Sequence, residues 1–429
     1  MRDSLKCFAI FRFLGHFRWC ICHLWWPILL AKFRYRLALR RIRAKAKNEP
    51  IRVLFVVGTS SKWKAQSLYD AMLESKVFEP YIVSAICDIE TKLSISGKVE
   101  HIKRQREFFG GKGMRFISAF DEKTGRDVDL NALNPDIVFY HQPWDVMPVH
   151  FPHYVAKSAL TFYIPYYVPN YGDLEFDCGS PFQRSMFGFI TLNKMWAETY
   201  RVYLRWRLHS CRFIPLGHTA LDGYRFNEYR EKNSKYVIFA PHWSIPCEGN
   251  ENSENYSTFL WSGNVILEYA KQHREINWMF KPHPTLKMVL MSTGVWSEEA
   301  IQAYWDEWEK LGKVCYDGNY YELFNEAEAI ITDCGSFLVE FACTGNPIIY
   351  IVSDVCKVVP IPASAMLFDS YYKVHNKNEL VRALQDVVSA GRDDMRELRL
   401  QRIRDAGLLG NNAAKNIMDY LSDLLGIHE

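Results

Sequence analysis

The chain has 429 residues, of which 48% are hydrophobic and 24% charged, and a formal net charge of +3. This length can bury a large core and predicts two or three domains, and the ordinary apolar content predicts a mostly soluble, globular chain. The 11 cysteines form no CxxC pair and no metal-ligand spacing, which favours a reduced cytosolic compartment over a disulfide framework or a zinc site.

The positive charge is concentrated at the start of the chain. Residues 1–47 contain 12 lysines and arginines and a single acid, Asp3, so this segment carries +11 and the remainder carries −8. Because the body of the protein is mildly acidic, its charge argues against nucleic acid as a partner.

The same leader is rich in aromatic residues, among them Trp19, Trp25 and Trp26. Its longest uncharged run, 19–31, is shorter than the roughly 20 apolar residues that a spanning helix needs. A basic tract follows where a secretion signal would have a cleavage site. Aromatic and basic side chains together suit the interface of an anionic membrane, so residues 1–47 are predicted to lie on a membrane surface. The alternative is a basic helix that is solvated or docks on the protein body.

Strands and helices alternate after the break at Asn48–Pro50, which predicts a first parallel α/β domain over residues 48–226. No GxGxxG follows its first strand and no GxxxxGK[ST] occurs in the chain. The usual sequence motifs of dinucleotide oxidoreductases and of P-loop enzymes are therefore absent. The predicted strands are 51–58, 80–87, 115–120, 136–141, 160–166, 189–192 and 212–216, and the predicted helices are 63–75, 99–109 and 194–208.

A polar segment, 227–235, marks a linker, and the alternation then restarts to predict a second α/β domain over residues 227–429. Two parallel-sheet domains joined in this way are expected to face a cleft, where open sheets bind ligands. The predicted strands are 236–243, 277–284, 329–332 and 347–352. The predicted helices are 259–272, 298–310, 320–326, one opening at Ser336, 378–389 and segments after 393.

The turn after the strand 329–332 has the features of a phosphate site. The first N–H groups of a helix have no internal partner, and the positive end of the helix dipole favours an anion. Gly335 allows close approach of the backbone, and Ser336 supplies a hydroxyl as an N-cap or phosphate donor. The alternative is an ordinary helix cap without a ligand.

Polar residues follow two further strands of the second domain. His242 and Ser244 come after one strand, and Lys281 and His283 after the next. Because the ends of parallel strands share one edge, these residues and Asp333 are predicted to line one pocket. Lys281 and His283 are suited to neutralise phosphate oxygens, and His283 as an imidazolium to protonate or stabilise a leaving phosphate. The alternative is a set of structural, hydrogen-bonded histidines.

Glu340 and His141 are further candidate residues. Glu340 lies one helical turn after Ser336, so it is either a ligand of ribose or substrate hydroxyls or an exposed helix acid. In the first domain His141, paired with Asp145, is the candidate general base for an acceptor hydroxyl. No carboxylate cluster suggests a metal, so neither a metal nor a cofactor is expected.

These pieces resemble the CDP-glycerol glycerophosphotransferase family, whose enzymes build poly(glycerol phosphate) chains of teichoic acids and related capsular polymers. The resemblance rests on Gly217 to Asp222, Ala240 to Trp243, Lys281 to Pro284 and Ile331 to Glu340. The family has a Trp-His-Gly-Thr-Pro segment with its base histidine, where this chain reads Phe162 to Tyr166, so either His141 substitutes for that base or the chemistry differs. An arginine that the family carries after the tryptophan is Ser244 here.

The resemblance implies a GT-B fold with the nucleotide in the second domain. His283 would touch the donor pyrophosphate, Gly335 and Ser336 would cradle phosphate, and Glu340 would lie near the donor. Gly217 and Asp222 are included among the substrate-binding residues on the same basis.

The expected function is transfer of glycerol phosphate, or a related polyol phosphate, from a CDP-activated donor to a lipid-linked or polymeric glycan, with CMP released. The expected location is the cytoplasmic face of a bacterial cell membrane. Two alternatives stay open: a GT-B glycosyltransferase that uses a nucleotide sugar, and a catalytically silent scaffold of a capsule-assembly complex.

Overall fold

The computed structural model describes residues 26–144, 146–172, 174–226, 236–246, 255–316, 320–410 and 412–427, which form two compact units. Unit 1 consists of Met1–Tyr167, Leu174–Asp222 and Asn412–Glu429, and unit 2 of Val168–Asp173 and Gly223–Asn411. This division differs from a single boundary after residue 226, because the last helix joins unit 1 and the short segment 168–173 joins unit 2. The predicted linker at 227–235 lies outside the described residues.

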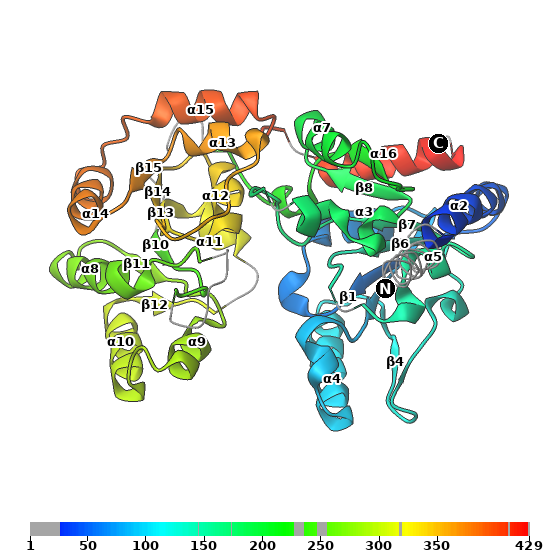
Figure 1. Ribbon diagram of the computed structural model, residues 1–429, viewed down its shortest axis with the longest axis horizontal. Helices are drawn as coiled ribbons and strands as arrows, with labels where there is room; N and C mark the ends of the chain where they lie inside the picture. The colour runs from blue at the N-terminus through cyan, green and yellow to red at the C-terminus, as the bar shows by residue number, and fades with distance from the viewer. Residues whose placement is uncertain are drawn as a thin grey trace, which may run out of the picture. The chain divides into compact units, whose positions relative to one another are not determined.

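Unit 1 is built on a parallel sheet with the strand order β3-β2-β1-β6-β7-β8-β9. Figure 1 labels the strands β1, β6, β7 and β8 of this sheet. The strands are apolar on both faces because helices flank the sheet, which is typical of parallel sheets. The strands are β1 (Ile51–Val57), β2 (Phe78–Ser84), β3 (Phe116–Ser118), β6 (Ile137–Tyr140), β7 (Leu160–Tyr163), β8 (Gly188–Thr191) and β9 (Arg212–Pro215), and the helices are α2 (Trp26–Lys45), α3 (Gln66–Glu74), α4 (Ile95–Gly111), α5 (Pro152–Val155), α6 (Pro181–Arg184), α7 (Lys194–Tyr203) and α16 (Ala413–Leu425).

Unit 2 has a second parallel sheet, with the order β12-β11-β10-β13-β14-β15. Its strands are β10 (Tyr236–Ala240), β11 (Trp278–Phe280), β12 (Lys313–Val314), β13 (Ala327–Thr332), β14 (Ile348–Ile351) and β15 (Tyr372–Val374). Its helices are α8 (Phe259–Gln272), α9 (Leu286–Thr293), α10 (Glu298–Leu311), α11 (Tyr321–Asn325), α12 (Gly335–Ala342), α13 (Pro362–Phe368), α14 (Lys377–Ala383) and α15 (Arg396–Asp405).

Both sheets are doubly wound. In each, the chain runs outward from a middle strand to one edge, returns to the other side of that strand and continues to the opposite edge. The strand order therefore reverses between β1 and β6 in unit 1 and between β10 and β13 in unit 2. The prediction of an α/β fold with two Rossmann-like sheets is confirmed, and the cleft stays a prediction.

The described part of the basic leader is the helix α2, which packs against α5, β7 and α16. Its buried side chains recur every three or four residues and join the apolar core of unit 1. Tyr35, which is 3% exposed, donates from its hydroxyl to the carbonyl oxygen of Ser185 over 2.8 Å. Docking on the protein body, the alternative in the sequence, is thus what residues 26–45 do, whereas residues 1–25 lie outside the described residues. Across the described chain, no helix combines the length and apolarity that crossing a bilayer requires.

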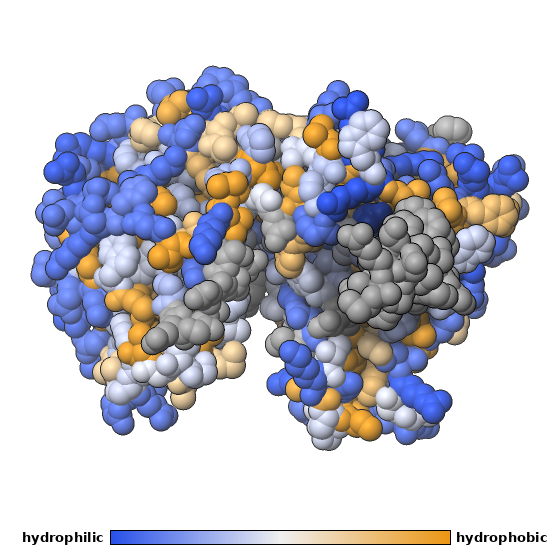
Figure 2. Space-filling model, in the orientation of Figure 1, coloured by the Kyte–Doolittle hydropathy of each residue, from blue (hydrophilic) through white to orange (hydrophobic). Residues whose placement is uncertain are grey.

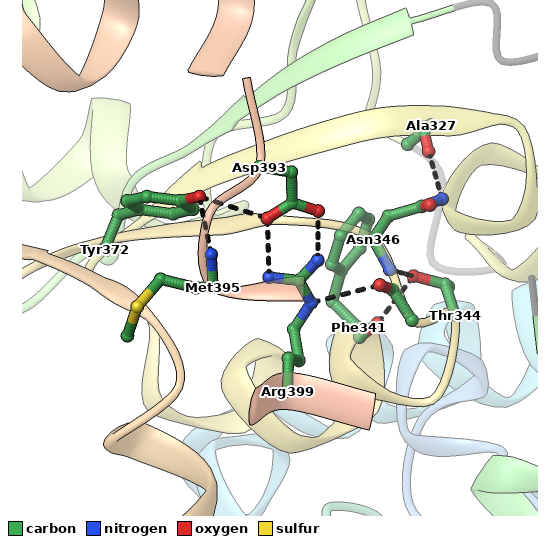
Figure 3. A network of polar contacts seen from close by, with 9 residues as sticks. Ala327, Phe341, Thr344, Asn346, Tyr372, Asp393, Met395 and Arg399 are labelled. Atoms are coloured by element: carbon green, nitrogen blue, oxygen red, sulfur yellow. Dashed lines mark hydrogen bonds and ion pairs between the residues drawn. The ribbon is translucent and has the colours of Figure 1, made fainter. Parts of the chain in front are cut away.

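The buried side chain of Arg399 fastens the helix α15 to the rest of unit 2 (Figure 3). Arg399, whose side chain is fully buried, forms two hydrogen bonds with the carboxylate of Asp393. Its Nε also donates to the carbonyl oxygen of Gly345 over 3.0 Å, and Asn346 next to it donates to the carbonyl of Ala327 over 2.8 Å. Arg399 therefore fixes the turn that leads from α12 into β14.

Replacing Arg399 with alanine leaves the carboxylate of Asp393 buried without its cation. Breaking a buried pair costs about 3–5 kcal/mol, so we expect Arg399→Ala to lower the stability of unit 2 by this order. The measurement is denaturant unfolding combined with hydrogen exchange of unit 2 peptides. Arg392→Ala is the matched control, because its pair with Asp386 is exposed and is expected to contribute less than about 1 kcal/mol. Equal effects of the two substitutions would contradict the role of Arg399.

Candidate functional site

Polar residues from three loops gather at one edge of the sheet of unit 2. The strands β10, β11 and β13 are parallel neighbours, with β10 in the middle. His242 follows β10, His283 follows β11, and Asp333 follows β13 directly. The structure therefore brings these residues to the carboxyl edge at the β10/β13 reversal, where doubly wound sheets bind ligands.

The buried carboxylate of Asp333 ties the loops after β10 and β13 together. It is 2% exposed and accepts hydrogen bonds from the backbone N–H groups of His242 and Thr258, both over 2.6 Å, and from the hydroxyl of Thr258 over 3.0 Å. Burial raises the pKa of Asp333 to about 6, against the lowering effect of these hydrogen bonds. Asp333 is thus occupied by the protein backbone, which gives it a positioning role.

His242 and His283 have the same local geometry. In each, the Nδ1 atom accepts a hydrogen bond of 3.2 Å from the backbone N–H two residues later and lies beside the hydroxyl of that residue, which is Ser244 or Thr285. Because Nδ1 accepts, a neutral ring carries its proton on Nε2. The ring centroids are 5.6 Å apart, so both Nε2–H donors lie at the same part of the edge.

Both histidines are neutral at physiological pH. Burial lowers the pKa of His242 to about 3, with a smaller effect of His283. Burial also lowers the pKa of His283 to about 4, assisted by the cationic Lys281. The two rings are half-buried. They therefore offer uncharged N–H donors in place of the imidazolium that the sequence suggests for His283.

The helix α12 starts two residues after Asp333, which holds the backbone of His242, and its first turn contains Gly335 and Ser336. Within the described chain, the N-cap residue Cys334 makes no side-chain capping hydrogen bond, while Ser336 is half-buried. Gly335 has a further role that the sequence does not indicate. A Cβ atom there would lie 2.6 Å from the Cε2 atom of Tyr171, so the glycine admits this ring. The side chain of Asn170 also donates to the Gly335 carbonyl.

Lys281 and Glu340 lie in one buried cluster with two tyrosines. Glu340 is 1% exposed and accepts hydrogen bonds from the hydroxyls of Tyr224 and Tyr320, each over 2.9 Å. The Nζ atom of Lys281 lies 4.9 Å from the ring centroid of Tyr320. Glu340 is therefore not an exposed helix acid, and its contact with substrate hydroxyls stays a prediction.

Two predicted substrate-binding residues belong to unit 1. Gly217 has a φ of 98°, a conformation that favours glycine, and packs in a buried turn. Asp222 accepts hydrogen bonds from the N–H groups of Ala413 and Ala414 over 2.7 and 2.9 Å, and from the hydroxyl of Ser67 over 2.7 Å. These contacts make Asp222 an anchor for the start of α16.

The proposed base His141 is enclosed in the core of unit 1. It is fully buried, its Nδ1 lies 2.9 Å from the carbonyl oxygen of Ile164, and it meets Trp63 edge-on at 5.4 Å between ring centroids. Burial lowers its pKa to about 4. Its predicted partner Asp145 lies outside the described residues. This environment is that of a structural histidine, so we do not assign proton transfer to His141.

Several residues at this edge of the sheet were not predicted from the sequence. Thr285 and Thr258 hold His283 and Asp333, whereas Tyr171, Tyr224 and Tyr320 surround Gly335 and Glu340. The repeated spacing of a histidine and a hydroxyl residue two positions later is a signal for the first of these. The tyrosines have no comparable signal, because they approach from distant parts of the chain.

Comparisons with known proteins identify the fold. No protein-family model and no curated protein sequence matches the chain. A UDP-GlcNAc 2-epimerase structure from Methanocaldococcus jannaschii matches with a TM-score of 0.51 and 13% identity over 87% of this chain and 99% of that one. A UDP-N-acetylglucosamine 2-epimerase structure from Rickettsia bellii matches with a TM-score of 0.50 and 13% identity over 88% and 98%. The chain therefore has a fold of the GT-B type.

The raised pKa of Asp333 gives a pH-dependent prediction. Folding raises this pKa from 3.8 to about 6, so the carboxyl stabilises the folded state most below pH 3.8 and loses this contribution as the pH rises through about 6. We expect the stability difference between wild type and Asp333→Asn to be larger at pH 5 than at pH 7.5, measured by denaturant unfolding. Asp369→Asn, which removes an exposed acid of the same unit that pairs with a lysine, is the control for a general surface effect. A difference that stays constant with pH would refute this assignment.

Proposed function

We propose that the carboxyl edge of unit 2 binds the diphosphate of a nucleotide-linked donor and that the protein transfers the activated group to an acceptor hydroxyl. The observation that carries this proposal is the meeting of His242, His283 and the first turn of α12 at the β10/β13 reversal. These groups are hydrogen-bond donors of the kind that bind phosphate oxygens, and the positive end of the helix dipole favours the same charge.

The neutral histidines suit a ligand that brings its own negative charge. Without a ligand, burial and the nearby cation of Lys281 lower the pKa of His283, so its ring is neutral. A bound diphosphate can accept a hydrogen bond from the Nε2–H of the neutral His283 ring, because Nδ1 already accepts one from the backbone N–H of Thr285. His283 then stabilises the charge that accumulates on the diphosphate as the bond to the transferred group breaks. Asp333 acts indirectly, by holding the backbone of His242.

The first candidate is a glycosyltransferase that uses a nucleotide sugar. The structures with the same fold are named for the conversion of UDP-GlcNAc, a nucleotide sugar, although their identity of 13% supports the fold alone. In this reaction the acceptor oxygen attacks the sugar carbon and the nucleoside diphosphate leaves. The acceptor in this proposal is a hydroxyl of a lipid-linked or polymeric glycan.

The second candidate is the glycerophosphotransferase that the sequence resembles. It is favoured by Lys281 to Pro284 and by Ile331 to Glu340, whose polar residues occupy the two flanks of the same edge. In this reaction the acceptor oxygen attacks the donor phosphorus and CMP leaves. CMP released from CDP-glycerol supports this candidate, whereas UDP released from a UDP-sugar supports the first. Nucleotide binding without turnover of any donor supports a scaffold.

Substitution of the edge residues tests the binding site. We expect His283→Ala to weaken binding of UDP or CDP by about 10- to 100-fold, because a hydrogen bond to a charged group contributes about 1.5–3 kcal/mol. Ser336→Ala should weaken binding by a smaller factor. Isothermal titration calorimetry of the full chain measures both effects.

His375→Ala is the matched control for this experiment. His375 also follows a strand of the same sheet, but its strand β15 is the far edge strand and its side chain is exposed beside Asp354. Its replacement should leave nucleotide binding unchanged. Unaltered binding in His283→Ala, or equal losses in both histidine variants, would rule out the proposed diphosphate site.

A further inference from the structure

The helix α2 has a second apolar face that points away from the protein. Its inner face, with Ile28, Tyr35 and Ile42, is buried in unit 1. On the outer face, Trp26 is 60% exposed, Leu29 48%, Phe33 60% and Leu37 49%. These four residues are three or four positions apart, so they form one stripe along the helix, which we name the outer stripe. Figure 2 shows hydrophobic and hydrophilic side chains mixed in the region that α2 occupies in Figure 1.

Cations border the outer stripe on the exposed surface. Lys32, Arg36 and Arg40 are exposed along the helix, and α2 contains no acidic residue. A helix with a row of large apolar side chains between cations has the composition of helices that lie in the interface of an anionic bilayer. Each cation near such a surface adds to the attraction for anionic lipid.

The cations that do not border the stripe hold the helix in place. Lys45 forms an ion pair of 2.5 Å with the buried Asp136, and the guanidinium of Arg34 donates to the carbonyl oxygen of His153 over 2.6 Å. The Nε atom of Arg43 donates to the carbonyl of Leu424 over 2.8 Å. The inner contacts therefore keep α2 flat on unit 1 with the outer stripe turned outward.

The contacts of α2 also locate it on the sheet. Its partner residues lie within a few positions before the starts of three strands: Asp136 before β6, Ser158 before β7 and Ser185 before β8. The helix thus runs along the amino edge of the parallel sheet of unit 1. The carboxyl edge of that sheet, where ligands of doubly wound sheets bind, lies at the other ends of the strands.

We propose that the outer stripe of α2 inserts into the surface of an anionic lipid bilayer, with Lys32, Arg36 and Arg40 on the lipid headgroups. Charge selects this occupant. A second copy of the chain docked stripe to stripe would bring the cations of two helices together, whereas anionic headgroups neutralise them. This inference does not depend on the proposed nucleotide site, because every residue that carries it belongs to unit 1.

Vesicle binding tests this proposal with the full chain. Wild type should co-sediment with phosphatidylglycerol-containing vesicles more strongly than with pure phosphatidylcholine vesicles, and less so at high salt. The triple variant Leu29→Asn, Phe33→Asn, Leu37→Asn should lose about tenfold or more in apparent affinity, because buried apolar area is removed. The variant Arg36→Gln, Arg40→Gln keeps the stripe and should lose part of the preference for anionic lipid.

A matched triple variant on unit 2 controls for general surface polarity. Met288, Met291 and Val295 are 61%, 48% and 40% exposed, and their replacement by asparagine should leave vesicle binding unchanged. Thermal unfolding of each variant separates loss of fold from loss of binding. The proposal is overturned if the α2 triple variant binds vesicles like wild type, if the unit 2 variant loses as much, or if wild type ignores anionic vesicles. It is also overturned if light scattering shows that wild type is an oligomer and the α2 triple variant a monomer, while wild type does not bind vesicles.

Discussion

The carboxylate of Asp333 is the contact on which the candidate site depends. It lies at the end of the central strand pair and accepts backbone hydrogen bonds from the loops that carry His242 and Thr258. Those bonds fix the backbone of His242, which in turn places its ring 5.6 Å from that of His283. A buried acid thus contributes to the site without facing a ligand, since its oxygens are occupied by the protein. The donors at the edge are arranged before any anion arrives.

The strands at the centre of each sheet could be predicted from the sequence, because they are buried on both faces and appear as continuous apolar runs. Residues 53–57 of β1 and 329–331 of β13 are examples. The edge strands β12 (Lys313–Val314) and β15 (Tyr372–Val374) carry no such run and went unpredicted. Nor does local pattern show that α16 returns to unit 1. Its amphipathic face indicates a helix with a partner, without naming the partner.

The candidate site was predictable to the extent that it follows from topology. Residues after parallel strands share an edge, which is why His242, His283 and Asp333 were expected together. Contacts over long sequence separations were not predictable. The side chain of Asn170 donates a hydrogen bond to the carbonyl of Gly335, 165 residues later, and the ring of Tyr171 packs against the same glycine. His141 is a different case. Its place after a strand suggested chemistry, but its burial against Trp63 makes it part of the core.

The return of α16 to unit 1 has a consequence for synthesis on the ribosome. Ala413, Ile417, Leu421 and Leu425 fill the core of unit 1, and Asp222 receives the first N–H groups of this helix. The ribosome makes these residues after those of unit 2. Unit 1 therefore completes its core only after the residues of unit 2 have been synthesised, although most of its own chain is made first. The nascent protein is thus an exception to amino-terminal-first domain folding, and neither unit corresponds to one uninterrupted gene fragment.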